Sequence, residues 1–260
     1  MLKYSPANAK TEALKEVEEL KPFLADKRKI YSLDLLSGYS CPFANECLSK
    51  AVADENGKRT IQDGKNTKFR CFSASQEVQY NGVYNLRKHN FDTLRGLHLN
   101  DMTHELNQAM PKNLGICRIH VAGDFFSADY MFSWLVMAMM HQDRLFYAYT
   151  KSLKYWLKHM EWIDQLDNFV LTASYGGRDD KLIDEHMLRA SKVVFSEQEA
   201  EGLGLEIDHD DSHAARPSMK NQDFALLIHG TQPKDTEASE ALKLLKKNKV
   251  RHSYNRKVSA

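Results

Sequence analysis

The cysteines are the residues of this chain whose type and spacing most directly suggest chemistry. Five residues separate Cys41 from Cys47, and Cys71 follows after 23 more. Thiolate sulfur is a soft ligand for zinc or iron–sulfur clusters, and the metal itself favours loss of the thiol proton. All three lie in a polar loop, whereas Cys117 opens an apolar segment and is expected in the core. Three unrelated buried cysteines remain the alternative.

The number of candidate ligands separates a structural metal site from a reactive one. A structural zinc ion normally takes four protein ligands, and the cysteine loop contains no histidine to complete such a set. A [4Fe–4S] cluster held by three thiolates keeps one iron free for a substrate or cofactor. Cys41, Cys47 and Cys71 therefore favour a catalytic centre over a purely structural one.

The elements that would position this loop alternate between short strand-like runs and longer amphipathic segments. This alternation predicts parallel βα units, which close either as a doubly wound sheet or as a complete or partial βα barrel. The predicted strands cover residues 29–36, 117–126, 145–152, 169–177, 192–197 and 224–231. The predicted helices cover residues 9–25, 75–95, 100–110, 127–141, 152–166, 180–190 and 236–248.

Polar residues follow the predicted strands at the ends where α/β proteins place their chemistry. His120 and Asp124 have the same parity on the second strand, and His120 is either a ligand, a proton carrier or a core histidine. Tyr147 and Tyr149 share a face of the third strand and either line a cavity or pack in the core. The segment 209–213, HDDSH, is either an exposed loop or a metal site.

Length and composition favour one domain over residues 1–260, with a helical extension at 1–28 and a basic helix and tail at 232–260. The 36 basic and 35 acidic side chains nearly cancel, which argues against nucleic-acid binding through bulk charge. Contact of the basic C-terminal stretch with nucleic acid stays open. No apolar run has the length of a membrane span and no secretory signal is seen, so we expect a cytoplasmic protein without a membrane partner.

Several segments resemble a known family from about residue 30 to residue 200. SGYSCPFANEC, FRCFSAS, RIHVAGDFFS and FYAYTKSLKYW are similar to the phage-associated gene product 88 domain family. A three-cysteine loop after the first strand and a Gly-acid element ending the second also resemble the radical S-adenosylmethionine (SAM) fold. The cysteine spacing departs from the Cys-x3-Cys-x2-Cys pattern usual in that superfamily.

The radical SAM resemblance implies a partial (β/α)6 barrel and a set of site residues. Cys41, Cys47 and Cys71 would each bind one iron of a [4Fe–4S] cluster, and the fourth iron would bind S-adenosylmethionine. The segment Gly123, Asp124 and Phe125 would contact the amino group of SAM. The candidates for the SAM carboxylate, its ribose or the substrate are Thr150, Lys151, Ser174 and Ser196.

The function expected from the resemblance is radical SAM-type chemistry on an unknown substrate, with an external reductant. A nucleic acid or a nucleotide stays open as the substrate, and the host cytoplasm is the expected location if the chain is phage-encoded. Two alternatives come from other classes. One is a zinc-stabilised module that binds nucleic acid or protein without catalysis, and the other is an iron–sulfur protein that does not use SAM.

Overall fold

The computed structural model describes residues 1–250, and its centre is an eight-stranded, mostly parallel sheet. Only the short edge strand β1 runs antiparallel to its neighbour. The strands, in their order across the sheet, are β1 (Ser5–Pro6), β2 (Lys29–Ser32), β5 (Leu114–Arg118), β6 (Leu145–Thr150), β7 (Phe169–Ser174), β8 (Ala190–Val194), β10 (Phe224–Leu227) and β9 (Glu206–Ile207). The predicted α/β class is confirmed, and all six predicted strands are present as β2, β5, β6, β7, β8 and β10. Residues 251–260 of the predicted basic tail lie outside the described part of the chain.

Each face of the sheet has its own hydrophobic cluster. Alternate side chains such as Cys117, Phe146 and Phe169 pack against a layer of helices on one face, as expected from the two-residue period of a strand. These helices are α3 (Asn81–Leu94), α4 (Leu99–Ala109), α5 (Ala128–Met140), α6 (Leu153–Lys158), α7 (Met160–Asp164) and α8 (Lys181–Glu185). Cys117 is fully buried there, so its predicted place in the core is confirmed.

The opposite face is covered by the N-terminal segment and by one short helix from late in the chain. Leu14 and Leu20 are fully buried against Ile116 and Tyr147 of the sheet. The covering elements are α1 (Ala9–Glu12), the 3-10 helices η1 (Ala13–Glu16) and η2 (Glu18–Leu24), and α10 (Ser212–Ala215). Near the β8–β10 side of the sheet, α9 (Glu197–Gly202) and α11 (Glu237–Lys247) pack on a third cluster; the short 3-10 helix η3 (Pro217–Met219) follows α10.

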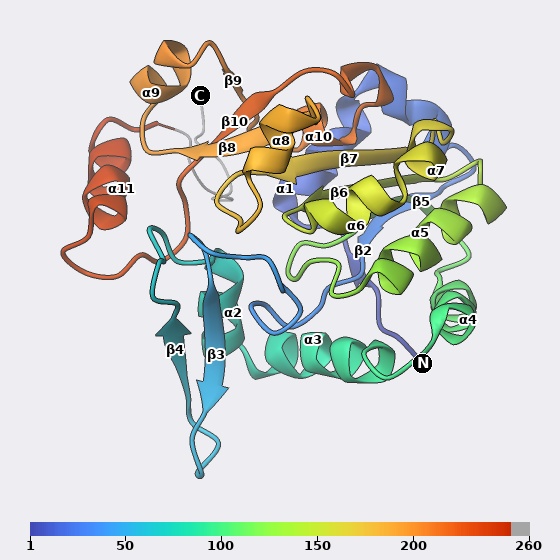
Figure 1. The fold of residues 1–260 in the computed structure, drawn as a ribbon, viewed down its shortest axis with the longest axis horizontal. Coiled ribbons are helices and arrows are strands. Elements are labelled where there is room, and N and C mark those ends of the chain that lie inside the picture. Colours follow the sequence, from blue (N-terminus) through green and yellow to red (C-terminus); the bar gives the residue numbers. More distant parts are fainter. Residues whose placement is uncertain (251–260) are drawn as a thin grey trace.

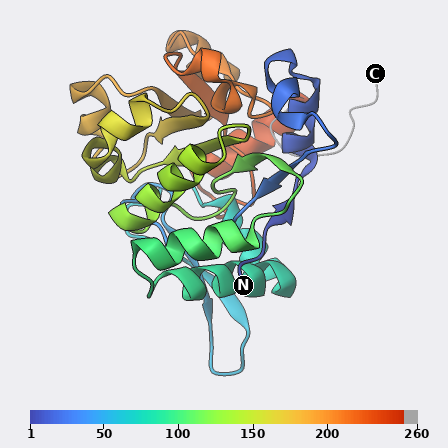
Figure 2. The same ribbon diagram turned by 90° about the vertical axis from the view of Figure 1, so that its right-hand side faces the viewer.

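The segment between Cys47 and Cys71 forms an antiparallel hairpin, which the sequence analysis did not predict. Its strands are β3 (Ser49–Ala53) and β4 (Arg59–Asp63), and it projects away from the body of the molecule (Figures 1 and 2). Asn56-Gly57 lies in its turn, and this residue pair is a common hairpin signal in sequence. The hairpin returns the chain to Cys71 and to α2 (Phe72–Gln79) beside the sheet.

Some predicted boundaries were wrong. The predicted helix over residues 9–25 is a short α-helix followed by 3-10 turns, and Pro22 lies inside the last of them, where it supplies no backbone N–H donor. The predicted helices at 75–95 and 152–166 are interrupted at Tyr80 and His159. The predicted strand at 117–126 ends at Arg118, and the following residues form a loop. Within residues 1–250, no helix is both long and apolar enough to cross a membrane.

Candidate functional site

The loop that carries Cys41 and Cys47 is hydrogen-bonded to the loop that follows β7. It follows β2, yet the backbone N–H groups of Asn45 and Glu46 donate to the carbonyl of Gly176, at 3.2 and 2.9 Å. Gly176 lies in the loop after β7, and the next residue, Gly177, forms an isolated antiparallel bridge with Ala44. The loop therefore crosses the carboxyl ends of the strands and is held at both sides.

Cys71 reaches the same region from the other end of the hairpin. It is the residue directly before α2, and its N–H donates to Ser49 Oγ at 3.3 Å. Below it, the buried carboxylate of Glu77 on α2 accepts hydrogen bonds from the N–H and Oγ of Ser37, at 3.1 and 2.7 Å. Arg87 of α3 pairs with Glu77 at 3.1 Å. The buried Glu77 carboxylate thus joins the backbone before Cys41 to the helix after Cys71, and its ion pair with Arg87 ties both to α3.

The three thiols are half-buried and influence one another. Burial raises the pKa of Cys41 well above its ordinary value, and the charges of Asp124, Cys71 and Cys47 raise it further. Burial and the charge of Cys47 raise the pKa of Cys71 to about 11. Cys47 and Cys71 also line the same pocket, although within residues 1–250 no three His, Cys, Asp or Glu side chains are placed to hold a single metal ion. Without a metal, Cys41 and Cys71 would remain neutral thiols at pH 7.

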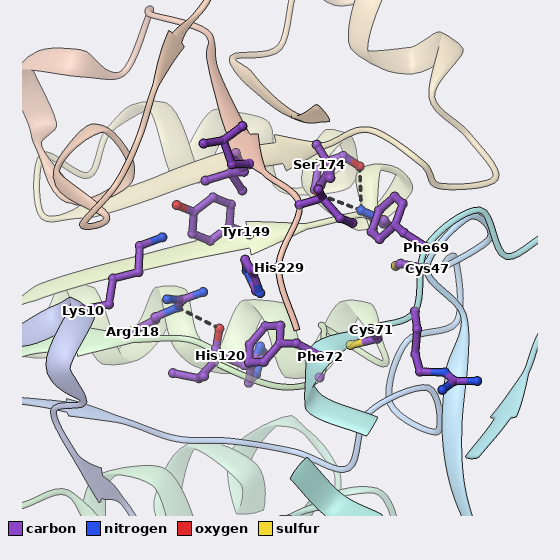
Figure 3. A pocket seen from close by; sticks show the side chains of 18 residues that line it. Lys10, Cys47, Phe69, Cys71, Phe72, Arg118, His120, Tyr149, Ser174 and His229 are labelled. Carbon is purple, nitrogen blue, oxygen red and sulfur yellow. Dashed lines mark hydrogen bonds between the residues drawn. The ribbon is translucent and has the colours of Figure 1, made fainter. Parts of the chain in front are cut away.

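A pocket of about 180 Å³ opens beside the cysteines (Figure 3). Cys47 and Cys71 lie at one end, and Lys10, Arg118 and Tyr149 lie at the other. Tyr149 therefore lines a cavity, as one of its two predicted roles required. The middle is walled by His120, Phe72 and His229 and by apolar residues of β8 and β10, with the rings of Phe72 and His229 4.8 Å apart.

Three of the predicted cofactor-binding residues line this pocket: Gly123, Lys151 and Ser174. Lys151 Nζ donates to Ser174 Oγ at 2.6 Å and to the carbonyls of Ser174 and Tyr175 at 3.2 and 2.9 Å. Gly123 has φ +96°, and a Cβ there would lie 2.7 Å from Leu35 Cβ and from Ser40 Oγ. Glycine is therefore required at this position for both its backbone conformation and the close approach of the cysteine loop.

The other predicted cofactor-binding residues have protein contacts of their own. Asp124 Oδ1 accepts from Thr150 Oγ1 at 2.6 Å and from the Phe125 N–H at 2.7 Å, and its Oδ2 accepts from the Lys151 N–H at 2.8 Å. The Phe125 side chain is fully buried, with its ring 5.2 Å from that of His120. Ser196 caps α9 by accepting from the Glu199 N–H at 3.1 Å and is not among the residues that line the described pocket.

His120 is buried at the pocket wall and makes one side-chain hydrogen bond. Its Nε2 lies 2.9 Å from the hydroxyl of Tyr130, and its Nδ1 has no hydrogen-bond partner among the described residues. Burial and the positive charge of Arg118 lower its pKa to about 3. The ring is therefore neutral at pH 7, and its Nδ1 is available for a hydrogen bond. The hydrogen bond between Nε2 and Tyr130 is what the core-histidine alternative predicts.

The basic end of the pocket is the part that sequence reasoning missed. Lys10 Nζ lies 2.7 Å from Asp211 Oδ1, and Arg118 pairs with Asp211 Oδ2. Asp211 belongs to the HDDSH segment, but it is fully buried, so the exposed-loop interpretation was wrong for this residue. Contacts between residues 10, 118 and 211 are set by the tertiary fold, and no local sequence signal marks them.

Comparison with known proteins gives one match. No curated protein and no solved structure matches the chain. The family model described as gene product 88 matches residues 2–251, nearly the whole sequence. The chain therefore belongs to the gene product 88 family.

Proposed function

We propose that this chain is an iron–sulfur enzyme of radical SAM type in which Cys41, Cys47 and Cys71 hold a [4Fe–4S] cluster. The observation that carries the proposal is the gathering of three half-buried thiols at the carboxyl edge of a parallel sheet, beside a pocket. In α/β proteins this edge is where ligands bind and chemistry occurs. The substrate is not identified by these residues.

The strand order supports a partial (β/α)6 barrel as the finer description of the fold. The six parallel strands β2, β5, β6, β7, β8 and β10 follow one another across the sheet in chain order. A βα barrel has this sequential order, whereas a doubly wound sheet reverses direction at a switch point. The βα helices α5 to α8 also pack into one cluster on one face, as they would on the outside of a barrel.

The number of thiols supports a cluster over a structural zinc ion, which normally takes four protein ligands. Thiolates bind zinc at about 2.3 Å, so the sulfurs of one tetrahedral site lie within roughly 4 Å of each other. The described residues contain no group of three His, Cys, Asp or Glu that could hold one metal ion. In a [4Fe–4S] cluster each thiolate binds a different iron, so three thiolates would leave one iron free for SAM.

The pocket residues have separate roles in this proposal. When bound, the cluster and SAM together would supply one-electron reduction and cleavage of a C–S bond. The Lys151 ammonium and the Ser174 hydroxyl offer a cation and a donor to a carboxylate, while Gly123 keeps the pocket wall close to the cysteine loop. The apolar wall, including Phe69 and Phe72, limits the access of water.

Metal content tests the cluster. After anaerobic reconstitution we expect about 4 iron and about 4 sulfide per chain, with the broad absorbance near ~400 nm of a thiolate-held cluster. Cys71→Ala should lose most of its iron. Cys117→Ala is the matched control, because Cys117 is buried in the core away from the three thiols, and it should keep the full content. A Cys71→Ala protein that kept all its iron would refute the ligand assignment, and a wild type that took up one zinc and no iron would refute the cluster.

Turnover tests the SAM half of the proposal separately. Reduction of the reconstituted protein in the presence of SAM should release 5′-deoxyadenosine and methionine, measured by chromatography and mass spectrometry. Cys71→Ala treated in the same way should release neither. A wild-type protein with an intact cluster that releases no 5′-deoxyadenosine would contradict the assignment and leave an iron–sulfur protein without this activity.

A further inference from the structure

We infer that the pocket end formed by Lys10, Arg118 and Tyr149 binds a carboxylate or phosphate group of the small molecule on which the site acts. The inference rests on the proposed function in one respect, since it takes this pocket as the place of reaction. Figure 3 shows these three residues across the pocket from Cys47 and Cys71. A substrate held there by its anionic group would extend toward the cysteines.

The charge of the pocket lining favours an anion. Among the described residues that line it, four carry basic side chains and none is acidic. Arg70 and Lys151 belong to the cysteine side by sequence or contact, since Arg70 directly precedes Cys71 and Lys151 binds Ser174. Lys10 and Arg118 form a separate pair at the other end.

Two buried carboxylates lie behind that pair: the Tyr149 hydroxyl is 3.3 Å from Asp211 Oδ1 and 3.5 Å from Asp208 Oδ2. Lys10 and Arg118 both contact Asp211 and both line the pocket, whereas neither carboxylate is among the described residues that line it. Tyr147 donates a further hydrogen bond to Asp211 at 3.1 Å and fixes the carboxylate in place. The Lys10 and Arg118 side chains are only 14% and 9% exposed, which reduces screening of their charge by solvent and salt. A preorganised, weakly screened cation pair is a good receptor for an oxyanion.

The rest of the pocket limits the size and character of the ligand. Between the two ends lie the rings of Phe72 and His229 and the side chains of Val193 and Leu226. The volume of about 180 Å³ is close to the roughly 150 Å³ cavity that accommodates a benzene molecule. The pocket therefore fits a ligand with one ring-sized apolar part and one acid group, which makes phenyl phosphate a suitable probe.

Binding of phenyl phosphate tests the inference by calorimetric titration of the full chain. The wild type should bind phenyl phosphate more tightly than phenol, and Lys10→Met should weaken that binding about tenfold, the loss of one charge-assisted hydrogen bond. Lys10→Arg should retain the affinity. Lys15→Met is the control, because Lys15 is exposed on the neighbouring η1 and pairs with Glu12, and it should bind like the wild type.

The titration also identifies the kind of anion and separates this inference from the cluster proposal. Parallel titrations with phenyl phosphate and benzoate show whether phosphate or carboxylate is preferred. Because the titration is done before and after reconstitution, absence of a cluster would refute the proposed function without preventing this binding. Failure of both probes to bind the wild type would overturn the inference, and so would equal binding by wild type and Lys10→Met.

A second measurement on the wild type avoids dependence on the folding of a variant. Lysine acetylation is followed by mass spectrometry with and without phenyl phosphate. The ligand should slow acetylation of Lys10 and leave that of Lys15 unchanged. Equal rates at Lys10 with and without ligand would overturn the inference.

Discussion

The Asp124 side chain links the ends of two neighbouring strands at the carboxyl edge of the sheet. It follows β5, but its carboxylate accepts hydrogen bonds from its own neighbour Phe125 and from Thr150 and Lys151 at the end of β6. Burial raises its pKa above the ordinary value, although the hydrogen bonds from Thr150 and the Lys151 N–H oppose that effect. The carboxylate therefore joins two strand ends at the place where Lys151 enters the pocket.

Replacing Asp124 with Asn should destabilise the protein. An amide offers one oxygen and one NH₂ group, so at least one of the donors that now faces a carboxylate oxygen would face a second donor. Leaving one buried donor unmatched costs about 1–3 kcal/mol. Urea unfolding should show this loss for Asp124→Asn and almost none for Asp167→Asn, since Asp167 is exposed. Equal stability of Asp124→Asn and the wild type would show that these hydrogen bonds contribute nothing.

At the scale of residues, the sequence indicates which side chains can do chemistry but not which residues they contact. The three thiols stand out because they lie in a polar loop, and Cys117 is correctly placed in the core because it lies in an apolar segment. Gly123 and Lys151 were found from their position after strands. Lys10 was missed because its contact with Asp211 spans 201 residues of sequence, and local pattern carries no information on such a pairing.

At the scale of elements, Asp211 connects three segments that cover or form the sheet. It precedes α10, pairs with Lys10 of α1 and Arg118 of β5, and accepts from Tyr147 of β6. Burial alone would raise its pKa, but Arg118 and Lys10 outweigh that effect and lower the pKa to about 2. The folded protein therefore favours the ionised carboxylate more than the unfolded chain does.

This pKa predicts acid-dependent stability. An unfolded Asp has a pKa of about 3.9, so the Asp211 contribution is fully present above that pH and is lost as the pH falls toward about 2. The two-unit shift corresponds to about 2.6 kcal/mol. Asp211→Asn should remove that part of the pH dependence, and it should lower stability at pH 7 by about 3 kcal/mol by leaving buried cations unpaired.

Unfolding free energies of wild type and variant between pH 2 and pH 7 provide the measurement. Glu12→Gln is the control, because its surface pair with Lys15 is half exposed and should contribute little. Parallel curves for the wild type and Asp211→Asn would contradict the assignment.

The strands that are buried along nearly their whole length were predicted correctly, whereas the strands that were missed are partly exposed. β5, β6 and β7 are buried along nearly their whole length, and such apolar runs are visible in the sequence. β4 alternates between partly buried and exposed residues, and its polar sequence RTIQD resembles a loop. The 3-10 form of residues 13–24 could not be predicted from the period of the apolar residues, since it depends on how this segment covers the sheet.

At the scale of the whole molecule, the sheet needs a cover on each face. Helices α3 to α8 cover one face, and the N-terminal segment together with α10 covers the other. The segment at 1–28 is thus an integral part of the core as well as an extension in sequence. It also delivers Lys10 to the pocket, so the same residues contribute to packing and to the proposed anion site.

Removal of residues 1–24 should therefore prevent stable folding. The deletion removes Leu14 and Leu20, both fully buried, and uncovers Ile116 and Leu145 on the sheet. Replacing one buried Leu by Ala costs about 2–5 kcal/mol, and a small domain has only about 5–15 kcal/mol in total. The truncated chain should lose its cooperative thermal transition and bind a hydrophobic dye.

Leu14→Ala alone should lower the free energy of unfolding by about 2–5 kcal/mol. Shortening the exposed hairpin turn at 54–58 to Asn-Gly is the matched deletion, and it should leave the transition unchanged. A truncated protein that melts like the wild type would show that this face of the sheet does not need its cover.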